Sequence, residues 1–503
     1  MSMLHKNLLK PLIWSVTFFI LPACVAAQTG EYFQISAPDY SGPLTVSAQS
    51  YPQLAAHRTQ VNLDLDAMGY VEEEYLVSGK ANVYEWALDG SVAVKSADAP
   101  YTTRILVRRP LNPGQFSGNV IVETLNNARR YDWAFIWALS YEHFVNRGDI
   151  YVAVTHSPAA IEVLKKFDPQ RYASLGLANP VPMETCGPDN LSSASEEGLK
   201  WDLISQVGVL LRSETGPLAG FDVETLVAST HTSELTTYAN AIHKNSRRSN
   251  GQPVYDGFVI KSEYVVADRI SRCALAPPDG DQRRIIRDAG VPVLRVIAQG
   301  DVLTTLSVRR EDSDEPSDRF RLWEVAGAPH MDKLYYQHMP VVEDQVKFGQ
   351  TGFLANWPMA YQCVPDIDLL DFPVMRHAVN AAFSAMTPWI NTGVSPPRAQ
   401  RIFVSQENSA EPDIITDVNG NAFGGMRNVY LDVPVASYFD SSPGPAVCTN
   451  LGRKDPFSWQ KLELLYGNAE NYANKVSQRL DSLVANGWLT DEDSGKIRQE
   501  LLP

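Results

Sequence analysis

The sequence lacks the surplus of basic residues that nucleic-acid binding requires. Among its 503 residues, 43 lysines and arginines are outnumbered by 58 aspartates and glutamates, and the formal net charge is −15. The basic residues come mostly in twos, such as Arg108-Arg109 and Arg247-Arg248, and form no stripe along the chain. Because proteins that bind nucleic acid neutralise phosphates with clustered lysines and arginines, we expect no nucleic-acid partner.

Cysteine is scarce, and its spacing matches no metal site. The chain has five cysteines, without a CxxC pair or an HExxH motif, so we expect neither a metal nor another cofactor. Cys24 lies in an N-terminal leader, which leaves four cysteines in the mature chain. In an oxidising compartment these indicate two disulfides with three possible pairings, of which we favour Cys186–Cys273 and Cys363–Cys448. The alternative is four separate buried thiols.

Long apolar runs are also missing, except at the N-terminus. Lys6 and Lys10 precede the run Pro11–Ala27, which ends in small residues. This is typical of a secretory signal, so we expect cleavage before Gln28 and export to the periplasm or the medium, without stable membrane insertion. One alternative is a membrane anchor, for which the run is short and contains two prolines. The other is a lipoprotein box at Leu21–Cys24, into which a proline fits poorly.

From about residue 103, short β-branched runs alternate with helical stretches. Two of the intervening segments, Tyr131–Arg147 and Glu197–Leu211, have the apolar spacing of helices. Buried strands separated by helices indicate an α/β fold with a mainly parallel sheet covered on both faces. The predicted strands are Arg104–Val107, Asn119–Glu123, Ile150–Val154, Thr225–Ala228, Gly257–Ile260 and Pro292–Ile297.

The sequence contains no internal repeat, low-complexity tract or Ser/Gly linker, which favours one large elaborated domain. Residues 158–196 are rich in proline and glycine and interrupt the strand–helix rhythm, so they predict a lid-like insertion over one end of the sheet. The alternative is a surface excursion with no role in binding. We divide the chain into a leader (1–27), a β-rich segment (28–102), an α/β core (103–395) and a C-terminal extension of strands and then helices (396–503).

Three residues that could carry catalysis come directly after predicted strands, where α/β sheets collect their functional groups. Ser229 follows a strand that ends at Ala228 and precedes a helical stretch, which is the context of a nucleophile elbow. The motif calls for glycine two residues before the serine and small residues after it, but the local sequence is Val227-Ala-Ser-Thr-His-Thr232, and these six residues alone favour a helix-capping serine.

Asp301 follows the strand that ends at Ile297, and His330 lies on a loop after a later strand. An aspartate at this point can orient a histidine, which would deprotonate Ser229 and then protonate the leaving group. The alternatives are an ordinary Gly-Asp turn and a structural loop histidine. Jointly, the chain order Ser, Asp, His is that of the α/β-hydrolase fold.

Oxyanion stabilisation needs backbone N–H groups beside the nucleophile. We expect them at Thr230 and, on the loop after an earlier strand, at Asn126 or Asn127. His231 lies two residues past the serine. It either crowds or assists Ser229, or lies on the exposed face of the first helical turn.

The chain resembles the bacterial and fungal α/β-hydrolase-domain proteins with long C-terminal extensions, over nearly the whole mature sequence. The resemblance depends mainly on Trp323-Glu-Val-Ala-Gly-Ala-Pro-His330, Gly424-Gly-Met-Arg427 and Asp432-Val-Pro-Val435. It implies an α/β-hydrolase fold with an ester-hydrolase type of site, in which Asp301 and His330 occupy the positions of acid and base.

The same resemblance places Ser229 at the nucleophile, in an elbow that typically reads Gly-Tyr-Ser-Gln-Thr-Gly. The register is fixed by residues that match downstream of the elbow, namely Leu235, Tyr238, Asn240 and Ala241. The sequence thus predicts a metal-independent serine hydrolase acting on a small carboxylic ester or lactone. The rival hypothesis is a catalytically silent relative that binds a ligand in the same pocket.

Overall fold

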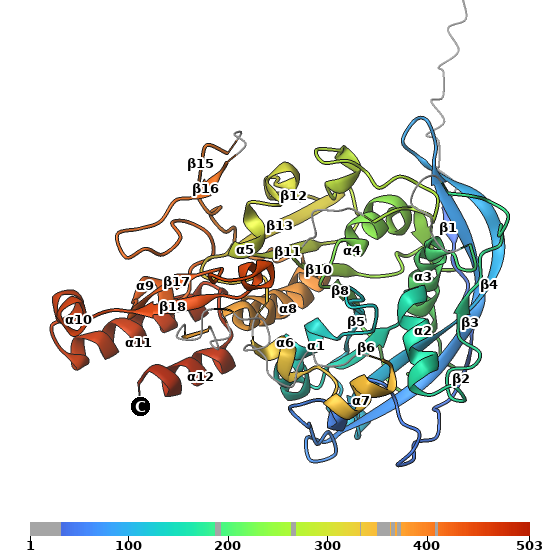
Figure 1. Cartoon of the computed structure of the whole chain (residues 1–503), viewed down its shortest axis with the longest axis horizontal. Helices are drawn as coiled ribbons and strands as arrows, with labels where there is room; N and C mark the ends of the chain where they lie inside the picture. The colour runs from blue at the N-terminus through green and yellow to red at the C-terminus, as the bar shows by residue number, and fades with distance from the viewer. Residues whose placement is uncertain are drawn as a thin grey trace, which may run out of the picture. The chain divides into compact units, whose positions relative to one another are not determined.

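The computed structural model describes residues 32–186, 193–262, 268–331, 333–349, 363, 368–369, 374–407 and 411–502. Phe33–Pro503 form one compact unit, which is drawn in Figure 1. The predicted leader, residues 1–27, lies outside the described residues. No helix in the described part of the chain has the length and apolarity needed to cross a membrane.

An eleven-stranded mixed sheet forms the centre of the unit (Figure 1). Its order is β12-β13-β11-β10-β8-β5-β6-β4-β3-β2, and β7 pairs with β4. All neighbours from β13 through to β6 are parallel, and the outer pairs are antiparallel. The predicted α/β-hydrolase fold is confirmed by this arrangement. The strands are β2 Asp39–Ser41, β3 Tyr70–Trp86, β4 Val92–Pro110, β5 Asn119–Thr124, β6 Ile150–Val154, β7 Gly176–Leu177, β8 Thr225–Thr230, β10 Gly257–Lys261, β11 Val293–Ala298, β12 Ser313–Glu315 and β13 Asp318–Val325.

Burial explains the apolar character of the central strands. Every residue of β5, β6, β8, β10 and β11 is buried, because helices and loops cover the sheet on both faces. In contrast, the first half of β4 is largely exposed.

Helices flank the sheet. α1 packs against α8, β6 and β8, and α8 also contacts β10, β11 and β13, whereas α3 packs on β3 and α4 on β8. The predicted helix at Tyr131–Arg147 begins four residues later, and the one at Glu197–Leu211 starts with a 3₁₀ turn. The helices of the core are α1 Phe135–Arg147, α2 Pro158–Phe167, α3 Lys200–Leu210, α4 Glu234–Thr237, α5 Gln299–Val302, α6 Lys333–Gln337, α7 Val342–Lys347 and α8 Val374–Thr392.

The C-terminal extension contains short strands, with α9 between them, followed by three helices, and it packs against β13. The backbone N–H of Met426 donates to the Glu324 carbonyl at 2.7 Å, and the Trp323 and Trp488 rings lie 5.2 Å apart. Its elements are β15 Val404–Ser405, β16 Asp413–Ile414, α9 Val429–Asp432, β17 Ala436–Phe439, β18 Arg453–Pro456, α10 Trp459–Tyr466, α11 Ala469–Ala485 and α12 Asp491–Leu501. Two further pairings join β14 Asp368–Leu369 to β18, and β1 Phe33–Gln34 to β9 Ser246–Arg247.

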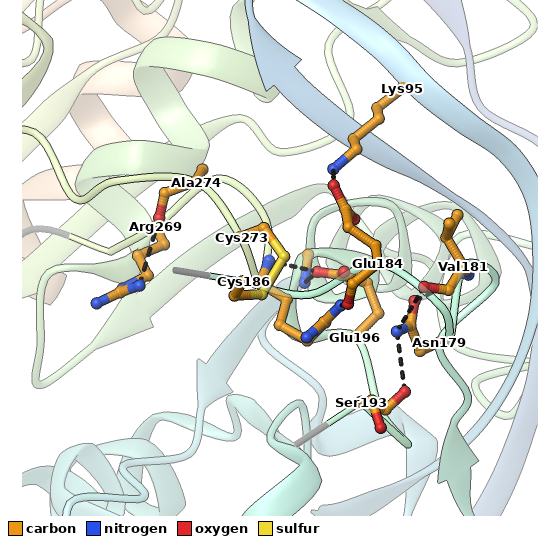
Figure 2. Close-up of a disulfide and its surroundings, with 12 residues drawn as sticks. Lys95, Asn179, Val181, Glu184, Cys186, Ser193, Glu196, Arg269, Cys273 and Ala274 are labelled. Atoms are coloured by element: carbon orange, nitrogen blue, oxygen red, sulfur yellow. Dashed lines mark hydrogen bonds and ion pairs between the residues drawn. A yellow bond between two sulfur atoms is a disulfide. The ribbon is translucent and has the colours of Figure 1, made fainter. Parts of the chain in front are cut away.

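Both predicted disulfides, Cys186–Cys273 and Cys363–Cys448, are present. Figure 2 shows that the first joins the insertion to the segment that follows β10. Within the insertion, α2 and β7 are ordered elements, and β7 pairs with β4. The division predicted at residue 102 falls inside β4, so the N-terminal segment and the core share a strand.

Candidate active site

Asp301 and His330 are in direct contact at the carboxyl ends of two neighbouring strands. Asp301 lies in α5, directly after β11, and His330 lies on the loop after β13. Because β11 and β13 are parallel, their carboxyl ends lie at the same edge of the sheet. His330 Nδ1 is 2.6 Å from Asp301 Oδ1. The structure therefore brings together the predicted acid and base, whose catalytic roles remain predictions.

The Asp301 carboxylate is buried, but hydrogen bonds and nearby positive charge from protein groups stabilise it. Its second oxygen accepts a 2.5 Å hydrogen bond from the hydroxyl of Ser262, which follows β10 in a left-handed conformation with φ of 62°. Burial alone would raise the pKa of Asp301. His330, the Lys261 charge and the Ser262 hydroxyl outweigh that effect and hold the pKa below its ordinary value. Asp301 is thus an anion that can orient the imidazole.

His231 is the first residue after β8, and it is buried beside His330. The two imidazole rings lie 5.3 Å apart, edge to face, and the His231 ring stacks on Phe135. Lys261, at the end of β10, lies with Nζ 2.8 Å from His231 Nε2 and donates to the His330 carbonyl at 3.0 Å. Burial, followed by the charges of Lys261 and His330, lowers the pKa of His231 well below its usual value. His231 is therefore a neutral ring that accepts a hydrogen bond from a buried ammonium.

A small cavity of about 80 Å³ opens on the two histidines. Its walls come from the loop after β5, the start of α1 and the segment after β13. The lining residues are Asn126, Ala128, Arg129, Trp133, Phe135, His231, His330, Met331, Tyr336 and Asn450. A reacting bond placed here would lie against the imidazole of His330.

A larger cavity of about 400 Å³ adjoins the small one, and Ala128 lines both. It lies at the carboxyl ends of β5, β6 and β8 and reaches the N-terminal turn before α3. Pro158, the first residue of the predicted insertion, and Glu197, the residue directly after its end, contribute to its walls. The lining residues are Asn127, Ala128, His156, Ser157, Pro158, Glu197, Lys200, Thr232, Ser233, Glu234 and Asp268.

The position of Ser229 differs from the expectation. β8 continues to Thr230, two residues beyond the predicted end, so Ser229 lies inside the strand and is fully buried. Its Oγ donates a 2.7 Å hydrogen bond to the Val259 carbonyl on β10, rather than to the His330 ring. Ser229 does not cap the following helix either, since Ser233 precedes α4. The residue that occupies the turn after β8 is His231, which is buried and not on an exposed helical face.

Two predicted oxyanion donors are also placed differently. Thr230 is the last residue of β8, paired with Thr124 and Ile260, and not the first residue after a turn. The backbone N–H of Asn126 donates to the Trp133 carbonyl at 3.1 Å and is therefore already used, although the Asn126 side chain lines the small cavity. Asn127 lines the larger cavity, and its role stays a prediction.

Lys261 and Ser262 were not predicted from the sequence. Both directly follow the predicted strand Gly257–Ile260, so a search for polar residues directly after strands, which identified Asp301, would have identified them as well. Within the described residues, no group of three or more histidine, cysteine, aspartate and glutamate side chains is arranged to hold a metal ion.

The family described as "Alpha/beta hydrolase domain" matches residues 40–499 of the chain. No curated protein matches it. Among solved structures, it is similar to a fungal esterase from Rhizomucor miehei at 12% identity, over 57% of this chain and 88% of that one, with a TM-score of 0.30. A thermostable esterase from Pseudomonas putida is similar at 12% identity, over 58% of this chain and 83% of that one, with a TM-score of 0.31.

Proposed function

Because the chain belongs to the alpha/beta hydrolase domain family, we propose that it hydrolyses a carboxylic ester or lactone in the cavity beside His330. The observation that carries this proposal is the 2.6 Å contact between Asp301 and His330, because His330 lines that cavity. A buried carboxylate on Nδ1 fixes the tautomer of an imidazole and stabilises its protonated form.

In the proposed reaction, Nε2 of His330 takes the proton of the nucleophile as the new C–O bond forms. It then returns the proton to the leaving oxygen as the old C–O bond breaks, and a water molecule repeats the cycle on the acyl-enzyme. The ammonium of Lys261, 3.0 Å from the His330 carbonyl, adds positive charge near the imidazole, which would stabilise an oxyanion formed there.

Ser229 remains the nucleophile that the sequence predicts. For it to attack a carbonyl, its hydroxyl would first have to release the Val259 carbonyl. The hydrogen bond from Ser229 to Val259 favours a second candidate function, a ligand-binding relative that forms no acyl-enzyme. In that relative, His231 occupies the turn after β8, where an active elbow would carry its nucleophile.

Asp301→Asn is the variant that tests the proposal. We expect it to lower kcat on p-nitrophenyl acetate and butyrate by roughly 10³- to 10⁴-fold, because an amide cannot hold the productive tautomer of His330. Asp413→Asn is the matched control, since Asp413 is exposed on β16 and does not line the cavity beside His330. Equal turnover of the Asp301 variant and the wild type would overturn the proposal.

Covalent labelling separates the two candidates. A fluorophosphonate probe should label the wild type and leave Ser229→Ala unlabelled if Ser229 forms an acyl-enzyme. A wild type that neither reacts with the probe nor turns over esters would instead support the ligand-binding alternative.

Export is part of the proposed function. Two disulfides support an oxidising compartment, and the sequence of the leader supports cleavage before Gln28. N-terminal sequencing of the protein recovered from the native host should begin at Gln28, and an intact leader would contradict export by this route.

A further inference from the structure

We propose that the larger cavity binds a polyhydroxylated group, such as a sugar or polyol, that forms part of the substrate. The link to hydrolysis rests on the proposed function, whereas the binding itself does not. The cavity is about five times the volume of the one beside His330, at 400 against 80 Å³. Ala128 lines both cavities, Asn126 lines the smaller one and Asn127 lines the larger one. Because the two cavities are adjacent, one substrate can occupy both.

A buried imidazole nitrogen without a partner marks the larger cavity as a binding site. His156 follows β6 and is only 2% exposed. Its Nε2 lies 3.0 Å from the Leu125 carbonyl, and a carbonyl can only accept, so Nε2 carries the proton. The other ring nitrogen, Nδ1, has no hydrogen-bond partner among the described residues, and Glu234 Oε1 lies 3.7 Å from Nε2. Buried polar atoms are normally satisfied, so a polar group on a bound ligand accounts for this one.

The charged side chains of the cavity define what the ligand must offer. Lys200 is 8% exposed, with its ammonium 2.9 Å from Asp268, and an ammonium only donates hydrogen bonds. Glu234 and Glu197 carry carboxylates, which only accept; Glu234 already receives the hydroxyl protons of Thr124 and Thr230. Obligatory donors and obligatory acceptors therefore line the same space.

Hydroxyl groups match this lining better than a charged group does. A hydroxyl both donates and accepts, so several hydroxyls on one ligand can satisfy Lys200, His156 and the carboxylates at the same time. An alkylammonium could not satisfy Lys200, because both groups only donate hydrogen bonds, although Glu197 and Glu234 would attract its charge. A carboxylate or phosphate would face three carboxylates, at Glu197, Glu234 and Asp268.

Direct binding tests the inference without requiring turnover. Titration calorimetry of the intact oxidised protein with a panel of free monosaccharides should detect binding at millimolar concentrations, and titration with ethylammonium or acetate should not. Glu197→Gln should weaken sugar binding by about tenfold, the loss expected for one hydrogen bond to a charged group. Glu197 is exposed, so this variant leaves the core intact. Glu162→Gln, an exposed glutamate on α2 outside the cavity, is the matched control and should bind like the wild type.

The buried positions provide a second measurement. His156→Phe removes the unpartnered ring nitrogen, and Lys200→Met removes the ammonium donor; each variant that retains the wild-type melting temperature should lose sugar affinity by about tenfold or more. If no monosaccharide binds, if Glu197→Gln binds as tightly as Glu162→Gln, or if ethylammonium binds better than every sugar, the inference is wrong.

Kinetics then separate this inference from the proposed function. The ratio of kcat/KM for a mono-O-acetylated sugar to that for p-nitrophenyl acetate should fall about tenfold in Glu197→Gln, and not in Glu162→Gln. Sugar binding with no hydrolysis of either ester would uphold the subsite and overturn the hydrolase. Hydrolysis of p-nitrophenyl acetate with no sugar binding would do the reverse.

Discussion

Glu123 is a buried acid that makes the stability of the protein depend on pH. It lies in β5 and accepts hydrogen bonds from the backbone N–H groups of Ile136 and Trp137 and from the Tyr151 hydroxyl. Burial outweighs these bonds and raises its pKa to about 7. A glutamate in an unfolded chain titrates near ~4.3, so the folded state holds this proton more tightly. The resulting stabilisation is complete below the unfolded pKa and is lost as the pH rises through about 7.

We therefore expect Glu123→Gln to flatten the pH dependence of stability. Wild-type free energy of unfolding should fall by up to about 3 kcal/mol between weakly acidic and neutral pH, and the variant should lack most of that fall. Urea unfolding across this range measures it. Glu162→Gln, on the surface, should keep the wild-type slope, and an unchanged slope in Glu123→Gln would contradict the assignment.

At the scale of single residues, the sequence located part of the site because of where strands end. Asp301 follows a strand that is apolar except for Arg295, and His330 follows a strand in which charged and apolar residues are mixed; in both, the strand signal runs to within a residue of the observed end. β8 is different: it continues through two polar residues, whose hydroxyls find buried acceptors at the Val259 carbonyl and the Glu234 carboxylate. The sequence pattern does not show that these two hydroxyls have hydrogen-bond acceptors inside the fold. The predicted strand therefore stopped at Ala228, the last apolar residue. His231, and not Ser229, is consequently the residue at the turn.

Among the elements, the β3–β4 pair contains three arginine–glutamate bridges, and two of them lie in very different surroundings. Arg104 on β4 lies 2.8 Å from Glu74 and 3.0 Å from Asp132, with all three side chains buried. Arg109, farther along the same strand, pairs with Glu73 at 2.8 Å with both side chains partly exposed. The two arginines thus allow a comparison within one pair of strands.

Removing Arg104 should be far more costly than removing Arg109. Arg104→Leu leaves Asp132 buried without a cation, whereas Glu74 keeps Arg171 at 2.5 Å, and we expect the variant to lower the free energy of unfolding by about 3 kcal/mol. Arg109→Leu removes a solvent-screened pair, for which about 0–1 kcal/mol is expected. Chemical denaturation of both variants is the measurement. Losses of similar size would show that the buried network around Arg104 is not what holds β4 in place.

Predicting the elements from the sequence succeeded where burial is uniform. The central strands are buried on both faces, so their apolar runs are almost continuous and easy to recognise. β4 is exposed in its first half and buried in its second, so only the second half has the pattern of a buried strand. The predicted boundary at residue 102 reflects that change of environment within one strand, not a division of the fold.

For the molecule as a whole, the two disulfides close loops of nearly equal length around different parts of the fold. Cys186–Cys273 spans 87 residues and Cys363–Cys448 spans 85. If a disulfide stabilises by restricting the unfolded chain, loops of this size are each worth at most about 4–5 kcal/mol. We therefore expect the double variants Cys186→Ser/Cys273→Ser and Cys363→Ser/Cys448→Ser to lose similar amounts of stability in denaturation experiments.

Their effects on the larger cavity should differ. Next to Cys273, the backbone N–H of Arg272 donates to Glu196 at 2.7 Å, and the same carboxylate accepts the N–H of Gly198 at 2.8 Å (Figure 2 labels Glu196). This link holds the turn that carries Glu197 and leads into Lys200, so loss of Cys186–Cys273 frees one wall of the cavity. We expect that double variant alone to weaken monosaccharide binding, by about tenfold, at temperatures where both variants are folded. Equal sugar affinity in the two variants would show that the wall is held by the fold itself, and a loss in both would show that the cavity depends on overall stability.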